Sequence, residues 1–148
     1  SGKMSYGVFE TSGVGGEMSG KKVRIKQNTS GIIASIAKNS IAVNTEKSAG
    51  VYAILLNKDG STYAQDRYFN VRFKELDWFL PKIEISRRGN LAVFKSPVFV
   101  WGACIELDGE ADLSDNCFDL LPGIEYTIQW PEGKALPAVI KTGNELML

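Results

Sequence analysis

The sequence contains no histidine among its 148 residues. Imidazole acid–base catalysis, Ser-His-Asp triads, Cys-His pairs and histidine-containing zinc motifs are therefore excluded. The chain has 17 basic and 17 acidic residues, so its formal net charge at pH 7 is zero. A neutral chain lacks the long-range attraction that a phosphate-binding surface needs, and nucleic acid is not an expected partner.

Long apolar runs and cysteines are also scarce. No apolar stretch approaches the roughly 20 residues that a membrane-spanning helix requires, so we expect no membrane partner. Cys104 and Cys117 are the only cysteines, too few for a zinc framework or a disulfide-rich scaffold. Hydrophobic residues make up 44% of the chain, which is enough to bury the core of one ordinary domain or two small ones.

Short runs of β-branched and aromatic residues recur along the chain, separated by Gly, Asn, Asp, Ser or Pro. Their spacing is close to the roughly 8–12 residues typical of β-sandwiches, and no amphipathic helix pattern accompanies them. We predict an all-β fold, an immunoglobulin-like antiparallel β-sandwich, arranged as two small sandwiches in tandem. The expected strands and hairpins are residues 23–26, 32–36, 51–71, 82–94, 98–107 and 124–130.

A connector from Phe73 to Pro81 mixes charged residues with bulky apolar ones. This composition favours a linker whose aromatic side chains pack against something. We place a domain boundary there, with a first sandwich at 1–73 and a second at 74–148 that ends in a loosely held tail after residue 131. One continuous domain is the alternative, and so is a first sandwich truncated at its start.

Residues 98–107 form the longest uninterrupted strand that the pattern predicts. Phe99, Trp101, Ala103 and Ile105 alternate along it, so they would share one face. We expect Phe99 and Trp101 on that face to point to the core.

The two cysteines lie in the two strands of a further predicted hairpin, on either side of its turn. If the loop between Leu107 and Ser114 is the turn, the antiparallel register places Cys104 directly opposite Cys117. A cross-strand disulfide and two separate thiols both fit such a pair. The sequence predicts that the cysteines lie close together and leaves their oxidation state open.

Acidic residues gather in segment 106–119, which contains six carboxylates and no Lys or Arg. Asp108, Glu110 and Asp112 have the spacing of a calcium loop, but Leu113 stands where such a loop needs glycine. A solvated hairpin loop is the simpler interpretation, so we predict no metal site and no cofactor. A surface loop also lacks the pocket that encloses paired glycosidase carboxylates, and we assign no catalytic residue.

Several aromatic residues are candidates for contacts with a sugar or with another domain. An exposed aromatic face offers flat apolar area to a pyranose ring, and Tyr63, Tyr68 and Trp78 could stack in this way. Phe73, Trp78 and Phe79 in the connector are expected to make domain contacts, because aromatic residues in a short charged linker have little reason to be exposed.

The stretch from Leu113 to Gly123 closely resembles a signature of β-mannosidases of glycoside hydrolase family 2, found near the end of their C-terminal immunoglobulin-like domain. That pattern runs Ser/Ala-Asp-Asn, an aromatic residue, Phe, a polar residue, Leu, a hydrophobic residue and Pro-Gly. The chain departs from it at Cys117, where the family usually has Tyr or Phe. The resemblance covers roughly residues 20 to 131, is specific at its C-terminal end and is weaker before residue 50. The matching positions are Ser114, Asp115, Asn116, Phe118, Leu120, Pro122 and Gly123.

The resemblance implies a non-catalytic C-terminal β-sandwich module of a β-mannosidase-like glycoside hydrolase. The family's catalytic glutamates lie in a separate barrel domain, so no catalytic role transfers to this chain, and activity on β-mannosides would belong to the parent protein. The implied partners are the parent's other domains. An accessory carbohydrate-binding module is the alternative. A periplasmic, secreted or lysosomal location is suggested by the resemblance alone.

The motif residues are expected to have structural roles. Asp115 and Asn116 can bond backbone groups of the acidic loop, and Phe118 and Leu120 would face the core. Pro122-Gly123 is suited to a tight turn into the last strand.

Overall fold

The structure is a computed structural model, and it describes residues 2–24, 26, 29–42, 45–105, 113, 115–139 and 141–148. These residues contain nine strands and no α-helix, which confirms the all-β prediction. None of the described helical segments is long and apolar enough to span a membrane.

The strands are β1 (Gly2–Glu10), β2 (Gly16–Val23), β3 (Ala49–Leu56), β4 (Thr62–Phe69), β5 (Glu84–Arg88), β6 (Leu91–Lys95), β7 (Val100–Cys104), β8 (Cys117–Leu120) and β9 (Tyr126–Gln129). The 3-10 helices are η1 (Lys38–Ser40), η3 (Phe73–Glu75) and η4 (Gly143–Leu146).

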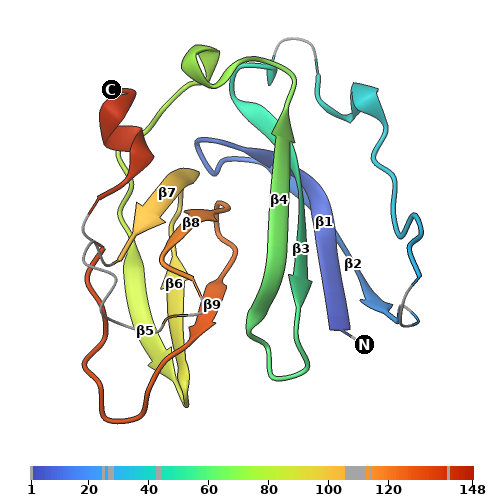
Figure 1. The fold of residues 1–148 in the computed structure, drawn as a ribbon. Coiled ribbons are helices and arrows are strands. Elements are labelled where there is room, and N and C mark those ends of the chain that lie inside the picture. The colour runs from blue at the N-terminus through green and yellow to red at the C-terminus, as the bar shows by residue number, and fades with distance from the viewer. Residues whose placement is uncertain are drawn as a thin grey trace.

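The described strands form three antiparallel sheets. The first half of the chain contributes a four-stranded sheet in the order β2-β1-β3-β4. The second half contributes a three-stranded sheet, β5-β6-β9, and a two-stranded sheet, β7-β8. Figure 1 shows the two halves side by side, with β4 on the side of the first sheet that faces β8 and β9.

The two predicted hairpins are confirmed as β3–β4 and β5–β6. In the first turn Gly60 has a φ of 87°, and the Asp59 carboxylate accepts the backbone N–H of Ser61 at 2.9 Å. In the second turn Gly89 has a φ of 60°. Both glycines occupy the left-handed region that side-chain-bearing residues rarely adopt, which explains why the sequence signal for these turns was strong.

The strands predicted at 23–26 and 32–36 are wrong. Residue 23 ends β2, no strand is found among the described residues of 24–37, and Ile32 is 89% exposed. The strands found at this side of the sheet are instead β1 and the edge strand β2, and both contain glycines. A Cβ atom on Gly7 would lie 1.8 Å from the carbonyl oxygen of Glu17. Residues 32–36 are exposed or half-buried and pair with no described strand, so their β propensity alone does not make them a strand.

A bulge in β7 changes which side chains reach which core. The pairing of β7 with β8 shifts between Val100 and Ala103, and Gly102 within the bulge has a φ of 56°. The extra residue moves later side chains to the opposite face. Phe99 and Trp101 thus pack toward the first half, while Val100 and Ala103 face the second-half core. The prediction of one shared face for residues 99–105 is wrong for this reason.

Two hydrophobic cores hold the described residues together. The second-half core lies between the β5-β6-β9 and β7-β8 sheets. Its buried members are Ala92, Phe94, Val100, Ala103, Ile105, Phe118, Leu120, Tyr126, Ile128 and Trp130. The junction core draws on both sides of the predicted domain boundary. Its buried members are Phe9, Tyr52, Ile54, Phe69, Leu76, Phe99 and Leu121.

The C-terminal tail, expected to be loosely held, is attached to the rest of the second half. The Cys104 N–H donates to the Lys141 carbonyl at 2.9 Å, and Asn144 is completely buried beside β7. The attachment uses polar side-chain and backbone contacts rather than an apolar repeat. The sequence pattern therefore did not indicate it.

The register predicted for the cysteines is confirmed. Cys104 of β7 pairs directly with Cys117 of β8, and both side chains are in the thiol form. The register expected for a turn between residues 107 and 114 therefore holds for the Cys104–Cys117 and Ala103–Phe118 pairs and is shifted by one residue at Val100–Leu120, beyond the bulge.

Candidate functional site

A groove of about 440 Å³ lies where β4 of the first half meets β8 of the second. It is open to solvent and its wall is mainly polar. The groove therefore suits a solvated polar ligand better than an enclosed apolar one. Its lining residues are Tyr63, Ala64, Gln65, Asp66, Arg67, Asp115, Cys117, Phe118, Asp119, Leu121 and Tyr126.

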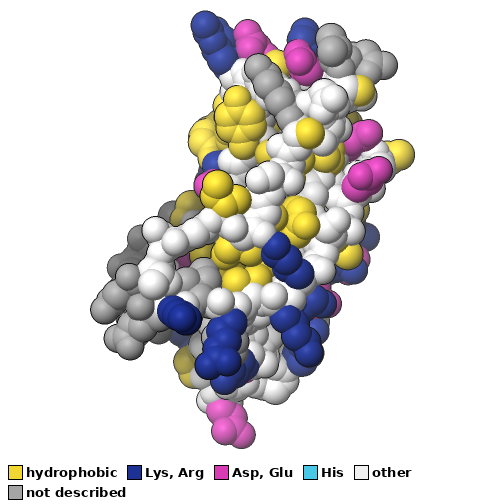
Figure 2. All heavy atoms as spheres, turned by 90° about the vertical axis from the view of Figure 1, so that its right-hand side faces the viewer, with side chains coloured by type: hydrophobic (Ala, Val, Ile, Leu, Met, Phe, Trp, Pro, Cys, Tyr) yellow, Lys and Arg dark blue, Asp and Glu magenta, His cyan; other side chains and the backbone are white. Residues whose placement is uncertain are grey.

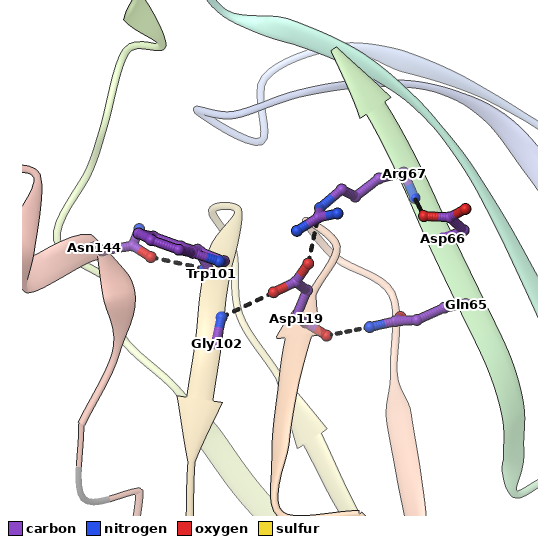
Figure 3. Close-up of polar contacts among 7 residues, drawn as sticks. All are labelled: Gln65, Asp66, Arg67, Trp101, Gly102, Asp119 and Asn144. Carbon is purple, nitrogen blue, oxygen red and sulfur yellow. Dashed lines mark hydrogen bonds and ion pairs between the residues drawn. The ribbon is translucent and has the colours of Figure 1, made fainter. Parts of the chain in front are cut away.

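Asp119 is the polar centre of this groove (Figure 3). Its Oδ2 lies 2.9 Å from Nε of Arg67, and its Oδ1 accepts the backbone N–H of Gly102 at 2.8 Å. Gln65 adds a hydrogen bond from its Nε2 to the Asp119 carbonyl at 2.6 Å. The residue thus connects β4, the bulge in β7, and β8.

Burial raises the pKa of Asp119 above its ordinary value, because the charged carboxylate is removed from water. The N–H of Gly102 and the guanidinium of Arg67 act in the opposite direction, and the charge of Asp66 adds to the rise. The net direction follows burial even though an ion pair is present, since the Asp119 side chain is only 17% exposed. Its two oxygens are already committed to structural donors.

A second carboxylate, Asp115, is also held by the fold. Its Oδ2 accepts the hydroxyl of Tyr126 at 2.6 Å, and its Oδ1 accepts the Cys117 N–H at 3.3 Å. The Tyr126 ring stacks on Phe118 at 4.3 Å between centroids. Burial and then the Asp115 hydrogen bond raise the pKa of Tyr126 well above its ordinary value, so this residue remains a neutral phenol that donates to Asp115.

A row of hydrogen bonds continues from the groove along β9. The Thr127 N–H donates to Oγ1 of Thr62 at 3.0 Å, and the Thr127 hydroxyl donates to the Gly60 carbonyl at 2.9 Å. The Gln129 amide donates to Asp59 at 2.8 Å. The turn between β3 and β4 is therefore bonded to the second half of the chain.

The remaining motif residues take up backbone and core positions. Asn116 accepts the Ile105 N–H through its carbonyl at 3.2 Å. Phe118 and Leu120 are buried in the second-half core. After Pro122, Gly123 has a φ of 70° and donates its N–H to the Ser96 carbonyl at 2.8 Å. Ser114 and the calcium-loop candidates Asp108, Glu110 and Asp112 lie outside the described residues.

The structure separates the aromatic candidates into two groups. Phe73 and Trp78 pack against the junction core, whereas Phe79 is 37% exposed. Tyr63 and Tyr68 are 70% and 62% exposed on β4. Tyr63 lies at a bulge in the β3–β4 pairing, because Leu55 pairs with Ala64 and Leu56 with Thr62. Tyr63 lines the groove, whereas Tyr68 does not.

Sequence reasoning did not find Gln65, Arg67 or Asp119 as groove residues. Arg67 and Asp119 are 52 positions apart, and nothing in either local pattern identifies the other as its partner. The only usable signal was the alternation of β4, which puts Gln65, Arg67 and the buried Phe69 on the same face.

A second, open groove of about 470 Å³ lies near the ends of β1, β2 and β3. Its charged lining residues in the described part of the chain are Lys3, Lys22, Arg24 and Lys58, all of them exposed. Figure 2 views the side of the molecule on which β2 lies, and Lys and Arg side chains gather toward the lower end of that view. Because these cations are exposed to solvent, salt screens their interactions with anions.

No metal centre is found in the part of the chain that the structure describes. No group of three or more His, Cys, Asp or Glu side chains is placed there to hold an ion. Comparison with models of known protein families finds no match, and no curated protein is significantly similar to the chain. The described groove presents hydrogen-bonding groups, the Arg67–Asp119 ion pair, aromatic rings and the Cys117 side chain.

Proposed function

We propose that this chain is a non-catalytic module of a β-mannosidase-like glycoside hydrolase. In this proposal its two halves are immunoglobulin-like β-sandwiches in tandem, and they support the catalytic part of a longer protein. The other domains of that protein are the partners. β-Mannoside hydrolysis belongs to the parent, and no residue of this chain performs it.

The observation that carries this proposal is the use of the motif side chains within the fold. Asp115 accepts two hydrogen bonds from the chain, and Phe118 and Leu120 are buried. Gly123 turns the chain into β9 at a positive φ. The groups that resemble the family signature hold strands in place, as expected of a supporting module.

The packing of the second half supports the sandwich part of the proposal. Its core takes buried side chains from both the β5-β6-β9 sheet and the β7-β8 sheet. Two antiparallel sheets that bury their facing side chains against each other are the defining feature of this architecture. In the first half, the four-stranded sheet buries one face in the junction core.

The proposal is tested with the full-length native protein that contains this chain. We expect that protein to hydrolyse p-nitrophenyl β-mannoside and the chain alone to be inactive. Leu120→Ala in the full-length protein should lower the melting temperature while kcat below that temperature stays unchanged, because Leu120 acts only through packing. Absence of turnover by the full-length protein, or turnover by the chain alone, contradicts the proposal.

The groove between β4 and β8 favours a second candidate, an accessory carbohydrate-binding module. Tyr63 offers an exposed ring at the edge of the groove, and Gln65 and Arg67 supply polar groups beside it. An aromatic platform next to hydrogen-bonding groups suits a sugar ring. Tyr68, which is also exposed on the same strand but lies outside the groove, provides a matched control.

Titration with manno-oligosaccharides tests this candidate by NMR. Binding should shift the resonances of Gln65 and Arg67. Tyr63→Ala should weaken the affinity by about tenfold, equivalent to about 1.4 kcal/mol, while Tyr68→Ala leaves it unchanged. No shift at millimolar oligosaccharide, or equal loss in both variants, dismisses the carbohydrate-binding candidate.

A further inference from the structure

The two cysteines occupy a specific kind of site in the β7–β8 ladder. The Ile105 N–H donates across the ladder to the Asn116 carbonyl at 3.2 Å, whereas the Cys104 N–H points away from β8 to the Lys141 carbonyl at 2.9 Å. Cys104 and Cys117 are therefore a non-hydrogen-bonded pair. At such pairs the Cα atoms approach to about 4.5 Å, closer than at hydrogen-bonded pairs.

This position meets the distance requirement of a disulfide. Disulfide-bonded residues have Cα atoms about 4.4–6.8 Å apart. The Cys104 side chain is close enough to that of Cys117 to contribute to its raised pKa. The cysteines can therefore bond without a change in strand pairing.

The bulge in β7 keeps the two cysteines in register. The Asp119 carboxylate holds the Gly102 N–H at 2.8 Å, immediately before the Ala103–Phe118 and Cys104–Cys117 pairs. A slip of one residue would turn one cysteine to the other face of the ladder. The ion pair of Asp119 with Arg67 thus also supports the cysteine geometry.

The two thiols differ in their access to solvent. Cys117 is exposed and lines the groove, while Cys104 is half-buried. Cys117 is thus the thiol that a dissolved oxidant meets first, and Cys104 lies behind it. Partial burial of the sulfur raises the pKa of Cys117, and electrostatic interactions with Cys104, Asp115 and Asp119 act in the same direction.

We propose that Cys104 and Cys117 are a reversible dithiol–disulfide site that reacts with small disulfides such as glutathione disulfide. The Cys117 thiolate attacks one sulfur of glutathione disulfide, forms a mixed disulfide and releases one glutathione thiolate. The Cys104 thiolate then attacks the Cys117 sulfur and displaces the second glutathione. Two protein thiols are oxidised, one glutathione disulfide is reduced to two glutathiones, and the two cysteine protons pass to the departing thiolates.

In this proposal, oxidation of the two cysteines stabilises the sheet with the fewest strands in the described fold. The β7–β8 sheet has two strands and an interrupted register, and two-stranded ladders are marginal without further support. A covalent link between opposite residues removes conformational freedom from the unfolded chain. The disulfide form should therefore melt several degrees above the dithiol form.

The test is incubation of the folded chain with excess glutathione disulfide, followed by intact mass spectrometry without reductant. We expect a monomer lighter by the mass of two hydrogen atoms, with no bound glutathione. Its melting temperature should rise by several degrees, and dithiothreitol should reverse both changes. The C104S variant should stop with one glutathione on Cys117, and the C117S variant should react far more slowly while folded.

Three outcomes for the wild-type chain overturn the proposal. These are a lasting glutathione adduct on Cys117, an intermolecular disulfide dimer, and a chain that stays fully reduced in excess oxidant. An oxidised monomer with an unchanged or lower melting temperature overturns its stabilising role. Because these readouts use the wild-type chain, they do not depend on whether either variant folds.

Discussion

The Asp119 side chain connects segments that are distant in the sequence. It accepts the Gly102 N–H at the β7 bulge and forms an ion pair with Arg67 of β4. Both contacts favour the charged form, yet burial outweighs them and the pKa of Asp119 is raised. Asp59 has the opposite behaviour, because hydrogen bonds from Ser61 and Gln129 lower the pKa of its exposed carboxyl.

These two aspartates give a prediction for carboxyl titration by NMR. Asp119 should titrate above Asp59, and Arg67→Gln should raise the pKa of Asp119 further because it removes a neighbouring cation. The variant should leave the pKa of Asp59 unchanged. Titration of Asp119 at or below the pKa of Asp59 would contradict the assigned effect of burial.

The same shifts set the sign of each group's contribution to the pH dependence of stability. The folded state holds the Asp119 proton more tightly than the unfolded state, so this contribution is full below the unfolded pKa and is lost as pH rises through the folded pKa. The Asp59 contribution is present above its unfolded pKa and is lost as pH falls through its lowered folded pKa.

Asn144 has the most concentrated set of hydrogen bonds in the C-terminal segment. Its Oδ1 accepts the Trp101 N–H at 2.8 Å, and its Nδ2 donates to the carbonyls of Phe79 and Phe99, each at 2.9 Å. The side chain is fully buried (Figure 3 shows its contact with Trp101). It therefore links η4 to both β7 and the connector.

Asn144→Ala should lower the free energy of unfolding by about 3 kcal/mol, because it leaves buried backbone groups without partners. The control is Asn90→Ala, which removes an exposed hydrogen bond to Gln129 at 2.9 Å and should cost less than about 1 kcal/mol. Urea unfolding measures both. Equal costs in the two variants would show that the tail does not depend on Asn144.

At the scale of elements, the connector is an aromatic junction. Phe73 of η3 packs edge-on against Phe69 of β4 and Trp101, with centroids 5.5 and 5.3 Å away. Trp78 contacts the Phe73 ring at 5.7 Å and donates its indole N–H to the Phe73 carbonyl at 2.9 Å. Phe99 of the second half lies 6.0 Å from Trp78. The connector therefore packs against side chains of both halves.

Trp78→Ala should destabilise the chain by about 3 kcal/mol, because the cavity would open inside this aromatic cluster. Phe79→Ala is the matched control in the same connector, and its exposed ring should cost less than about 1 kcal/mol. Chemical denaturation compares the two variants. A single unchanged cooperative melt in Trp78→Ala would argue against the connector as a structural joint.

At the scale of the whole molecule, the junction core contains side chains from both halves. Phe99 comes from the second half, yet its ring lies 5.5 Å from Phe9 and 5.4 Å from Phe69 of the first. The hydrogen bonds from Thr127 to the β3–β4 turn cross the same boundary. We expect these contacts to couple the two halves in one cooperative transition.

Phe99→Ala tests this coupling. It should cost about 3–5 kcal/mol and increase amide exchange in both β3 and β6, although the side chain belongs to neither strand. Leu91→Ala is the control, since Leu91 is buried on β6 outside the junction core. If Phe99→Ala increased exchange only in the second half, the halves would be energetically independent.

The sequence by itself determined the features that depend on neighbouring residues. Alternation and turn glycines were sufficient for the all-β class and for both hairpins, because strand faces and positive-φ turns are local properties. The antiparallel register through the predicted turn also placed Cys104 opposite Cys117. The glycosidase resemblance and the supporting role remain predictions from the motif.

Only the tertiary structure decided which faces and partners these strands have. One bulge at Gly102 places Ala103 and Ile105 on the face opposite to Phe99 and Trp101, so that only the latter two reach the junction core. Arg67 forms an ion pair with Asp119, which is 52 positions away in the sequence. Local propensity did not predict the glycine-containing pair β1 and β2, nor the tail held by Asn144. Such contacts depend on which segments come together in space, and their stability arises from burial and backbone pairing that no short sequence window contains.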